Sequence, residues 1–268
     1  MIMTSTSKQS MDPLPSYKQP PVDEVVCGLR FEPLKKLKIP HIGVLWKKFR
    51  NEFPTVQHVI PISTDASFVV DEATGVPLPR IWFISKADNE LIQFQSDRFY
   101  YNWRQRGDDY PRYPSIIKKF EKAKSQLEAF TNELELGTIT PLECDLTYIN
   151  HIPIGHGWQN IDDLSKVIRD FPWQKGKHNF LPNPANIAWQ ARFELPDGKG
   201  WLNVKLNQAK RKDGVLNLVL ELGAKGLGEE KTETAIRNWF DVAHEWIVRG
   251  FTDLTVKEVQ ENIWKREL

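Results

Sequence analysis

Glu90–Arg104 (ELIQFQSDRFYYNWR) gathers aromatic, amide and cationic side chains in one run without proline or glycine. We expect a single strand, Glu90–Trp103, whose side chains alternate between two faces, neither purely apolar. Aromatic rings supply contact area and arginine supplies directional hydrogen bonds, so such a strand can cover a protein partner or stack on bases. The predicted binding residues here are Arg98, Tyr101, Trp103, Arg104 and Arg106. In a structural alternative, Arg98 pairs with an acid such as Asp97 at the sheet edge, and Trp103 caps the following helix.

A second group of cations falls at the tip of a predicted hairpin and consists of Lys210, Arg211 and Lys212. Loop tips are usually charged for solubility, which is the simpler interpretation. The hairpin nevertheless matches one in the first half of the chain, so a nucleic-acid-binding module using the sheet and this hairpin is our alternative hypothesis. Asp108 and Asp109 lie among the cations that follow Arg104, which weakens the local positive field.

The pattern nearest to an acid–base or metal site combines Asp145, His151 and His156. A protein metal site usually needs a third strong ligand and a second shell, and no further motif supplies them. His244 falls beside an apolar helix face and is expected to be a core residue. Gly223–Gly228 follows a strand but lacks the full phosphate-loop pattern, so we expect a flexible connection there. We therefore predict no catalytic residue, no metal and no cofactor, with an enzyme of unknown class as a third hypothesis.

Composition sets the limits of these hypotheses. The chain has 268 residues, and 36 Lys and Arg against 35 Asp and Glu leave a formal charge of +1, so no global field attracts nucleic acid or anionic membrane. Cys27 and Cys144 both fall in apolar runs and are expected to be reduced and buried. We see neither a signal-peptide pattern nor an apolar run long enough for a membrane, which favours a cytoplasmic protein.

The elements expected to position these residues occur twice in the same order: a strand, a short helix, a meander of strands and a long helix. The expected divisions are a flexible arm (1–20), a first repeat (21–136), a second repeat (137–254) and a C-terminal helix (255–268). The fold class is therefore α+β with a tandem duplication, and we expect one continuous curved sheet with both long helices on one face. The alternative is two separate lobes joined near Gly137–Pro141.

Three motifs carry a family resemblance: PPVxEVV from Pro20, QxQxDRFxxNWR from Gln93 and YPxY from Tyr110. The chain resembles a sporadically distributed family of uncharacterised bacterial proteins of similar length. The sporadic distribution implies a mobile gene, such as a defence or toxin–antitoxin component. The expected architecture is similar to that of the TATA-binding protein, an analogy of fold alone. Our leading hypothesis is a non-enzymatic bacterial protein that recognises a protein partner.

Overall fold

The computed structural model describes residues 12–62, 70–71, 75–107, 109–171, 173, 180–210 and 214–267. Within these ranges the protein is an α+β structure. The helices are α1 (Ile39–Phe49), α2 (Tyr113–Glu133), α3 (Glu233–Leu254) and α4 (Lys257–Asn262), with short 3-10 turns η1 (Ile161–Lys166) and η2 (Pro196–Gly198). Among them, none combines the length and apolarity that a membrane span requires.

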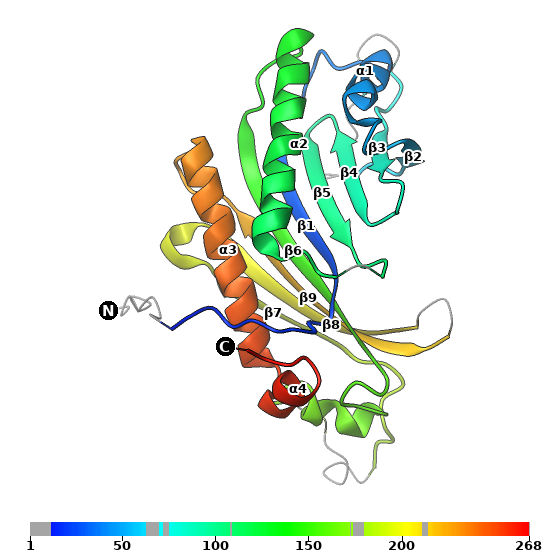
Figure 1. Cartoon of the computed structure of the whole chain (residues 1–268), viewed down its shortest axis with the longest axis vertical. Coiled ribbons are helices and arrows are strands. Elements are labelled where there is room, and N and C mark those ends of the chain that lie inside the picture. The colour runs from blue at the N-terminus through cyan, green and yellow to red at the C-terminus, as the bar shows by residue number, and fades with distance from the viewer. Residues whose placement is uncertain are drawn as a thin grey trace. The chain divides into compact units, whose positions relative to one another are not determined.

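The strands in the described ranges form one open antiparallel sheet of nine members, in the order β2-β3-β4-β5-β1-β6-β9-β8-β7 (Figure 1). Their bounds are β1 (Val22–Phe31), β2 (Thr55–Val59), β3 (Arg80–Ile84), β4 (Glu90–Gln95), β5 (Arg98–Arg104), β6 (Pro141–Pro153), β7 (Ala188–Glu194), β8 (Trp201–Lys210) and β9 (Leu216–Gly226). The α+β class and the single sheet are thus confirmed. A further strand expected at Ser67–Val70 lies almost wholly outside the described residues.

The chain divides into two compact units. Unit 2 comprises Val22–Ile149 and Lys225–Ile236, and unit 1 comprises Met1–Pro21, Asn150–Ala224 and Arg237–Leu268. In unit 2, alternate residues of β1 are fully buried, and α2 packs against β1 and β5. The apolar residues of α2 recur every three or four positions and form a seam, which is buried from Ile116 to Phe130 because residues at this spacing share one helix face.

The expected strand Glu90–Trp103 is wrong in one respect: it is a β-hairpin. Strand β4 ends at Gln95, Ser96 and Asp97 form the turn, and β5 begins at Arg98. Serine and aspartate favour turns because their side chains hydrogen-bond to nearby backbone. The turn resets the side-chain alternation, so Gln93 lies opposite Tyr100 and Phe94 lies opposite Phe99.

In unit 1, β7 and β8 form the hairpin predicted at Pro196-Asp197-Gly198. The pattern of Asn160–Phe171 predicts the short helix of the second repeat, with Asn160 as its N-cap. The structure forms the 3-10 turn η1 there, and Asn160 caps it by accepting a hydrogen bond from the Asp162 amide. Part of the expected arm is described, and there Tyr17 is buried, with its ring edge-on to Phe251 at 5.6 Å.

Candidate binding site

The amide side chains of the QxQxDRFxxNWR motif belong to a buried hydrogen-bond network on one face of unit 2. Gln93 and Asn102 are 6% and 3% exposed. Gln93 Oε1 accepts hydrogen bonds from Trp82 Nε1 at 3.1 Å and from Arg80 Nη2, while Gln93 Nε2 donates to Asn102 Oδ1 at 2.8 Å. Asn102 Nδ2 in turn donates to Glu24 Oε1 at 2.6 Å, and burial raises the pKa of Glu24. These amides bond to other side chains of the protein, which favours a structural role.

Arg98 and Asp97 hold the hairpin turn together. Arg98 donates through Nε and Nη2 to the two carboxylate oxygens of Asp97, at 3.0 and 2.7 Å. Gln95 Nε2 donates to Asp97 Oδ1 at 3.0 Å and also bonds to the backbone of Ile62. The structural alternative for Arg98, pairing with Asp97, is therefore confirmed, although the pair lies at a turn and not on an edge strand.

Tyr101 and Trp103 lie on the opposite, apolar face of β5 and are only 1% and 2% exposed. The Trp103 ring is 5.3 Å from that of Tyr110, and the Tyr110 hydroxyl donates to the Tyr148 hydroxyl at 3.0 Å. Burial raises the pKa of both tyrosines. A surface role expected for Tyr101 and Trp103 does not agree with this burial: these rings are part of the core, and Arg98 is buried as well.

The remaining predicted binding residues are cations at or near the surface. Arg104 and Arg106 both pair with Asp88, the latter at 2.9 Å. Lys210 is exposed at the end of β8, whereas Arg211 and Lys212 lie outside the described residues. Because one carboxylate partly neutralises two of these guanidinium groups, the local field is weaker than the sequence suggests.

The Asp145, His151 and His156 pattern does not make a metal centre. Asp145 Oδ2 pairs with Lys225 Nζ at 2.8 Å, so the lysine already balances the negative charge of Asp145. Over the described ranges no group of three or more His, Cys, Asp or Glu residues could hold a metal ion. His244 on α3 is largely buried, and desolvation lowers its pKa to about 4. The connection expected at Gly223–Gly228 is wrong for its first four residues, because strand β9 continues to Gly226.

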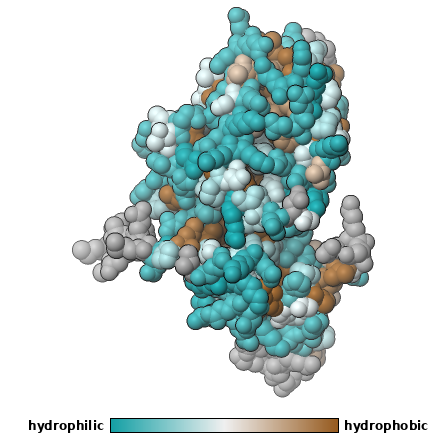
Figure 2. Space-filling model, viewed as in Figure 1, coloured by the Kyte–Doolittle hydropathy of each residue, from teal (hydrophilic) through white to brown (hydrophobic). Residues whose placement is uncertain are grey.

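Sequence reasoning missed a surface at the outer end of unit 1. Strand β7 pairs with β8 and stands last in the sheet order. Trp189 and Phe193 of β7 are 37% and 43% exposed, and Trp201 of β8 is 39% exposed. The face in Figure 2 is mainly hydrophilic, with apolar side chains in small separate groups. Alternation predicted the strand, but no local signal says that its apolar side chains stay uncovered.

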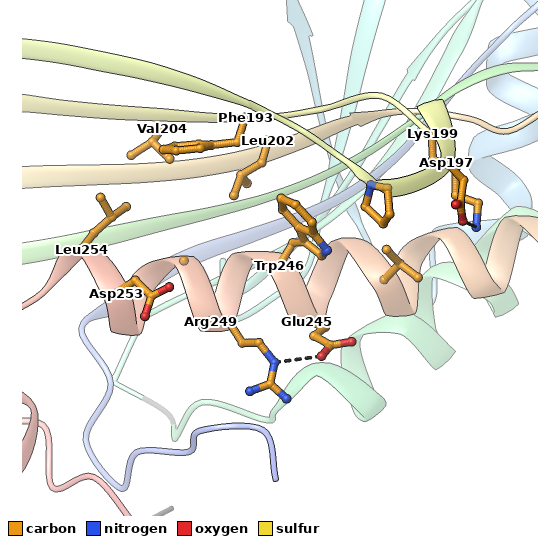
Figure 3. Close-up of a pocket in the computed structure, with 13 residues that line it drawn as sticks. Phe193, Asp197, Lys199, Leu202, Val204, Glu245, Trp246, Arg249, Asp253 and Leu254 are labelled. Carbon is orange, nitrogen blue, oxygen red and sulfur yellow. Dashed lines mark hydrogen bonds and ion pairs between the residues drawn. The ribbon is translucent and has the colours of Figure 1, made fainter. Parts of the chain in front are cut away.

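Beside this edge, α3 and the β7–β8 hairpin enclose a cavity of about 660 Å³ (Figure 3). Trp246 points from α3 toward Leu202 and Phe193 of the hairpin. Arg249 Nε donates to Glu245 Oε1 at 2.8 Å, and Arg249 Nη2 donates to the Asp12 carbonyl at 2.8 Å. The cavity is therefore apolar between its walls and charged along the rim.

Comparisons with known proteins give little to add to this geometry. No family model matches the chain, and no curated protein matches it. Among solved structures, the chain is similar to DynU16, a putative protein of the dynemicin biosynthetic locus. The two share 11% sequence identity with a TM-score of 0.24, and the match covers 86% of this chain and 98% of that chain. A likeness this weak transfers neither fold nor function.

Proposed function

We propose that this chain is a non-enzymatic binding protein that recognises a protein partner through β7 and its exposed aromatic side chains. The observation that carries the proposal is an edge strand whose apolar residues are uncovered. In β7 every residue except Ala191 is exposed. An edge strand offers unpaired backbone N–H and C=O groups, which a partner strand can satisfy by extending the sheet.

The side chains of β7 add specificity to such pairing. Trp189 and Phe193 share one face, because they lie four positions apart on a strand whose side chains alternate. On the other face the Arg192 guanidinium lies 4.3 Å from the centroid of the Trp201 ring. Tryptophan and arginine are enriched among the residues that contribute most to protein interfaces. The edge therefore combines backbone pairing with aromatic anchors.

Nucleic-acid binding has less support. Arg104 and Arg106 share Asp88, and Lys205 Nζ pairs with Glu221 Oε1 at 2.9 Å. A nucleic-acid surface needs cations that are free to neutralise phosphates. Binding that weakens steeply with added salt would favour this second function over the first.

The test replaces Trp189 and Phe193 together by glutamate and recovers the tagged protein from its own host. We expect the partner that copurifies with the wild-type chain to be lost, because two carboxylates would be buried at the interface. The matched control is Val56→Glu in β2, the strand at the other end of the sheet order, where Val56 is also exposed. An unchanged set of copurifying proteins in the Trp189 and Phe193 variant, with an unchanged Tm, would contradict the proposal.

We also propose that the chain arose by duplication, as in TATA-binding-protein-like folds. The support is the strand order, which is mirrored about the β1–β6 pair. In each half the first strand pairs with the last strand of its meander, β1 with β5 and β6 with β9, and earlier meander strands follow outward. A mobile defence or toxin–antitoxin role, implied by the family resemblance, would make the product of a neighbouring gene the first partner to examine.

A further inference from the structure

The cavity between α3 and the β7–β8 hairpin has the size and composition of a small-molecule site. Its volume of about 660 Å³ is in the range that encloses a drug-sized ligand. Phe193, Leu202, Val204, Trp246 and Leu254 provide apolar and aromatic lining. Both walls belong to unit 1, so the site is built within one compact unit.

Gly250 keeps this space open. On α3 it follows Trp246 by one turn, so both lie on the same helix face, which lines the cavity. A Cβ added to Gly250 would lie 3.4 Å from Leu202 Cδ2 and 3.6 Å from Leu222 Cδ2, an ordinary contact distance. Alanine would therefore fit here and favour the helix by about 1 kcal/mol over glycine. A larger side chain would instead extend into the cavity.

The residues that line the cavity include one more carboxylate than cation. Lys199 Nζ pairs with Asp197 Oδ2 at 3.2 Å, and Arg249 Nε pairs with Glu245 Oε1 at 2.8 Å. Asp253, one turn of helix beyond Arg249, also lines the cavity and forms no ion pair with any residue that the structure describes. The lining thus carries a net negative charge next to aromatic rings.

We propose that this cavity binds a small molecule with an apolar body and one protonated amine. The apolar body would lie between Trp246 and the hairpin, and the ammonium would pair with the Asp253 carboxylate. Aromatic faces such as that of Trp246 attract cations as well, which reinforces the preference for this charge. An anionic ligand of the same shape would meet an unbalanced carboxylate and be repelled. The cavity shares Phe193 with the β7 edge, but the groups that select the ligand, Asp253 and Trp246, belong to α3, and Phe193 is left unchanged in the test.

The test titrates three probes of one shape into the full-length chain by calorimetry: 4-phenylbutylamine, 4-phenylbutan-1-ol and 4-phenylbutanoate. We expect the amine to bind about tenfold or more tighter than the acid, a difference of about 1.4 kcal/mol, with the alcohol between them. In Asp253→Asn the three affinities should converge. The matched control, Asp241→Asn, removes a carboxylate from the same helix that does not line the cavity, and should retain the preference for the amine.

Two further variants locate the binding. Gly250→Leu extends a side chain into the cavity beside Trp246 and should weaken binding of all three probes, and Trp246→Ala, which only removes a ring, should weaken the amine most. Melting curves establish that each variant is folded. Three outcomes would overturn the proposal. The amine could fail to bind the wild-type chain, the acid could bind as tightly as the amine, or the affinity for the amine could be unchanged in folded Gly250→Leu and in Trp246→Ala. None of these results depends on whether β7 binds a protein.

Discussion

At the scale of single residues, Gly28 shows why one position in β1 carries no side chain. It lies opposite Tyr100 in the β1–β5 pairing, and a Cβ added to it would lie 2.1 Å from Tyr100 Cδ1. The tyrosine ring therefore lies across the glycine. Any larger residue at this position must displace a ring that is largely buried.

We predict that Gly28→Ala destabilises the fold by about 1–3 kcal/mol, the usual penalty for overpacking. Urea unfolding at equilibrium measures it. The control is Gly43→Ala in α1, where nothing lies within 4 Å of an added Cβ. That change should be neutral or stabilising, since alanine favours a helix. A Gly28→Ala protein as stable as the wild type would show that Tyr100 moves freely.

His244 gives the fold a dependence on acid pH. Its pKa is lowered from 6.5 to about 4 because burial disfavours the charged ring. Between these two values the unfolded chain binds a proton that the folded chain does not. Stability from this residue is therefore complete above pH 6.5 and is lost as the pH falls toward 4.

We predict that His244 makes the wild-type protein about 2 kcal/mol less stable at pH 5 than at pH 7, relative to a chain without this titration. The comparison is with His244→Gln, which keeps a polar side chain but does not titrate. Urea unfolding of both proteins at the two pH values gives the difference. Equal pH dependence in the two proteins would mean that His244 titrates normally.

At the scale of elements, α2 carries a buried lysine within its apolar seam. Lys124 Nζ contacts Glu128 Oε1 at 2.6 Å and Glu233 Oε1 at 2.7 Å, and its side chain is 5% exposed. Both glutamates are more exposed, so water can solvate them if the lysine is removed. The methylene stem of the lysine, and not its charge, is then the main source of stability.

The expected result is that Lys124→Ala costs about 1–2 kcal/mol, whereas Lys124→Met, which keeps the stem, stays within about 1 kcal/mol of the wild type. Urea unfolding of the two variants separates packing from charge. Equal losses in both would show that the two ion pairs dominate.

The elements that the sequence predicts well are long and periodic. The apolar residues of α2 recur over several turns and predict a helix over 115–134, which starts two residues after the start of α2 and ends one residue after its end. The hairpin at Ser96-Asp97 was missed because two polar residues in a mixed strand give a weak turn signal. Lys124 could not be identified as buried, since its partner Glu233 is distant in sequence.

The candidate site was predicted less well than the fold. The motif residues were found, but burial of Trp103 and the ion pair of Arg98 depend on which face of the hairpin is covered. The exposed rings of β7 and the cavity beside it arise because α3 leaves part of the sheet uncovered. That fact is a property of packing between segments distant in sequence, and no local pattern encodes it.

At the scale of the whole molecule, two strands run from one unit into the other. Strand β6 contributes Pro141–Ile149 to unit 2 and continues into unit 1 at Asn150, and β9 crosses the division at Lys225. A strand cannot easily lose its pairing in one unit and keep it in the next residues. We therefore expect the chain to unfold in one cooperative transition.

Each unit contains buried groups that can be used to follow or to perturb this transition. In unit 2, Cys27 and Cys144 are buried free thiols, as predicted, and burial raises the pKa of both. In unit 1, Tyr17 is buried against Phe251 and Trp264, and its hydroxyl and Thr252 Oγ1 share a 2.8 Å hydrogen bond. Next to Tyr17, the Lys18 amide donates a hydrogen bond to the Lys265 carbonyl of the C-terminal segment.

Tyr17→Ala should destabilise the protein by about 3–5 kcal/mol, the loss typical of a buried aromatic ring. If unfolding is cooperative, the urea concentration at which both thiols react with a disulfide reagent falls by the same amount as the midpoint of the tryptophan fluorescence change. Tyr17→Phe keeps the ring and loses only one hydrogen bond. The free energy of unfolding should therefore fall by only about 1 kcal/mol, and both midpoints should shift little. Thiol reactivity that stays at the wild-type urea concentration in Tyr17→Ala would show that the two units unfold independently, despite the strands they share.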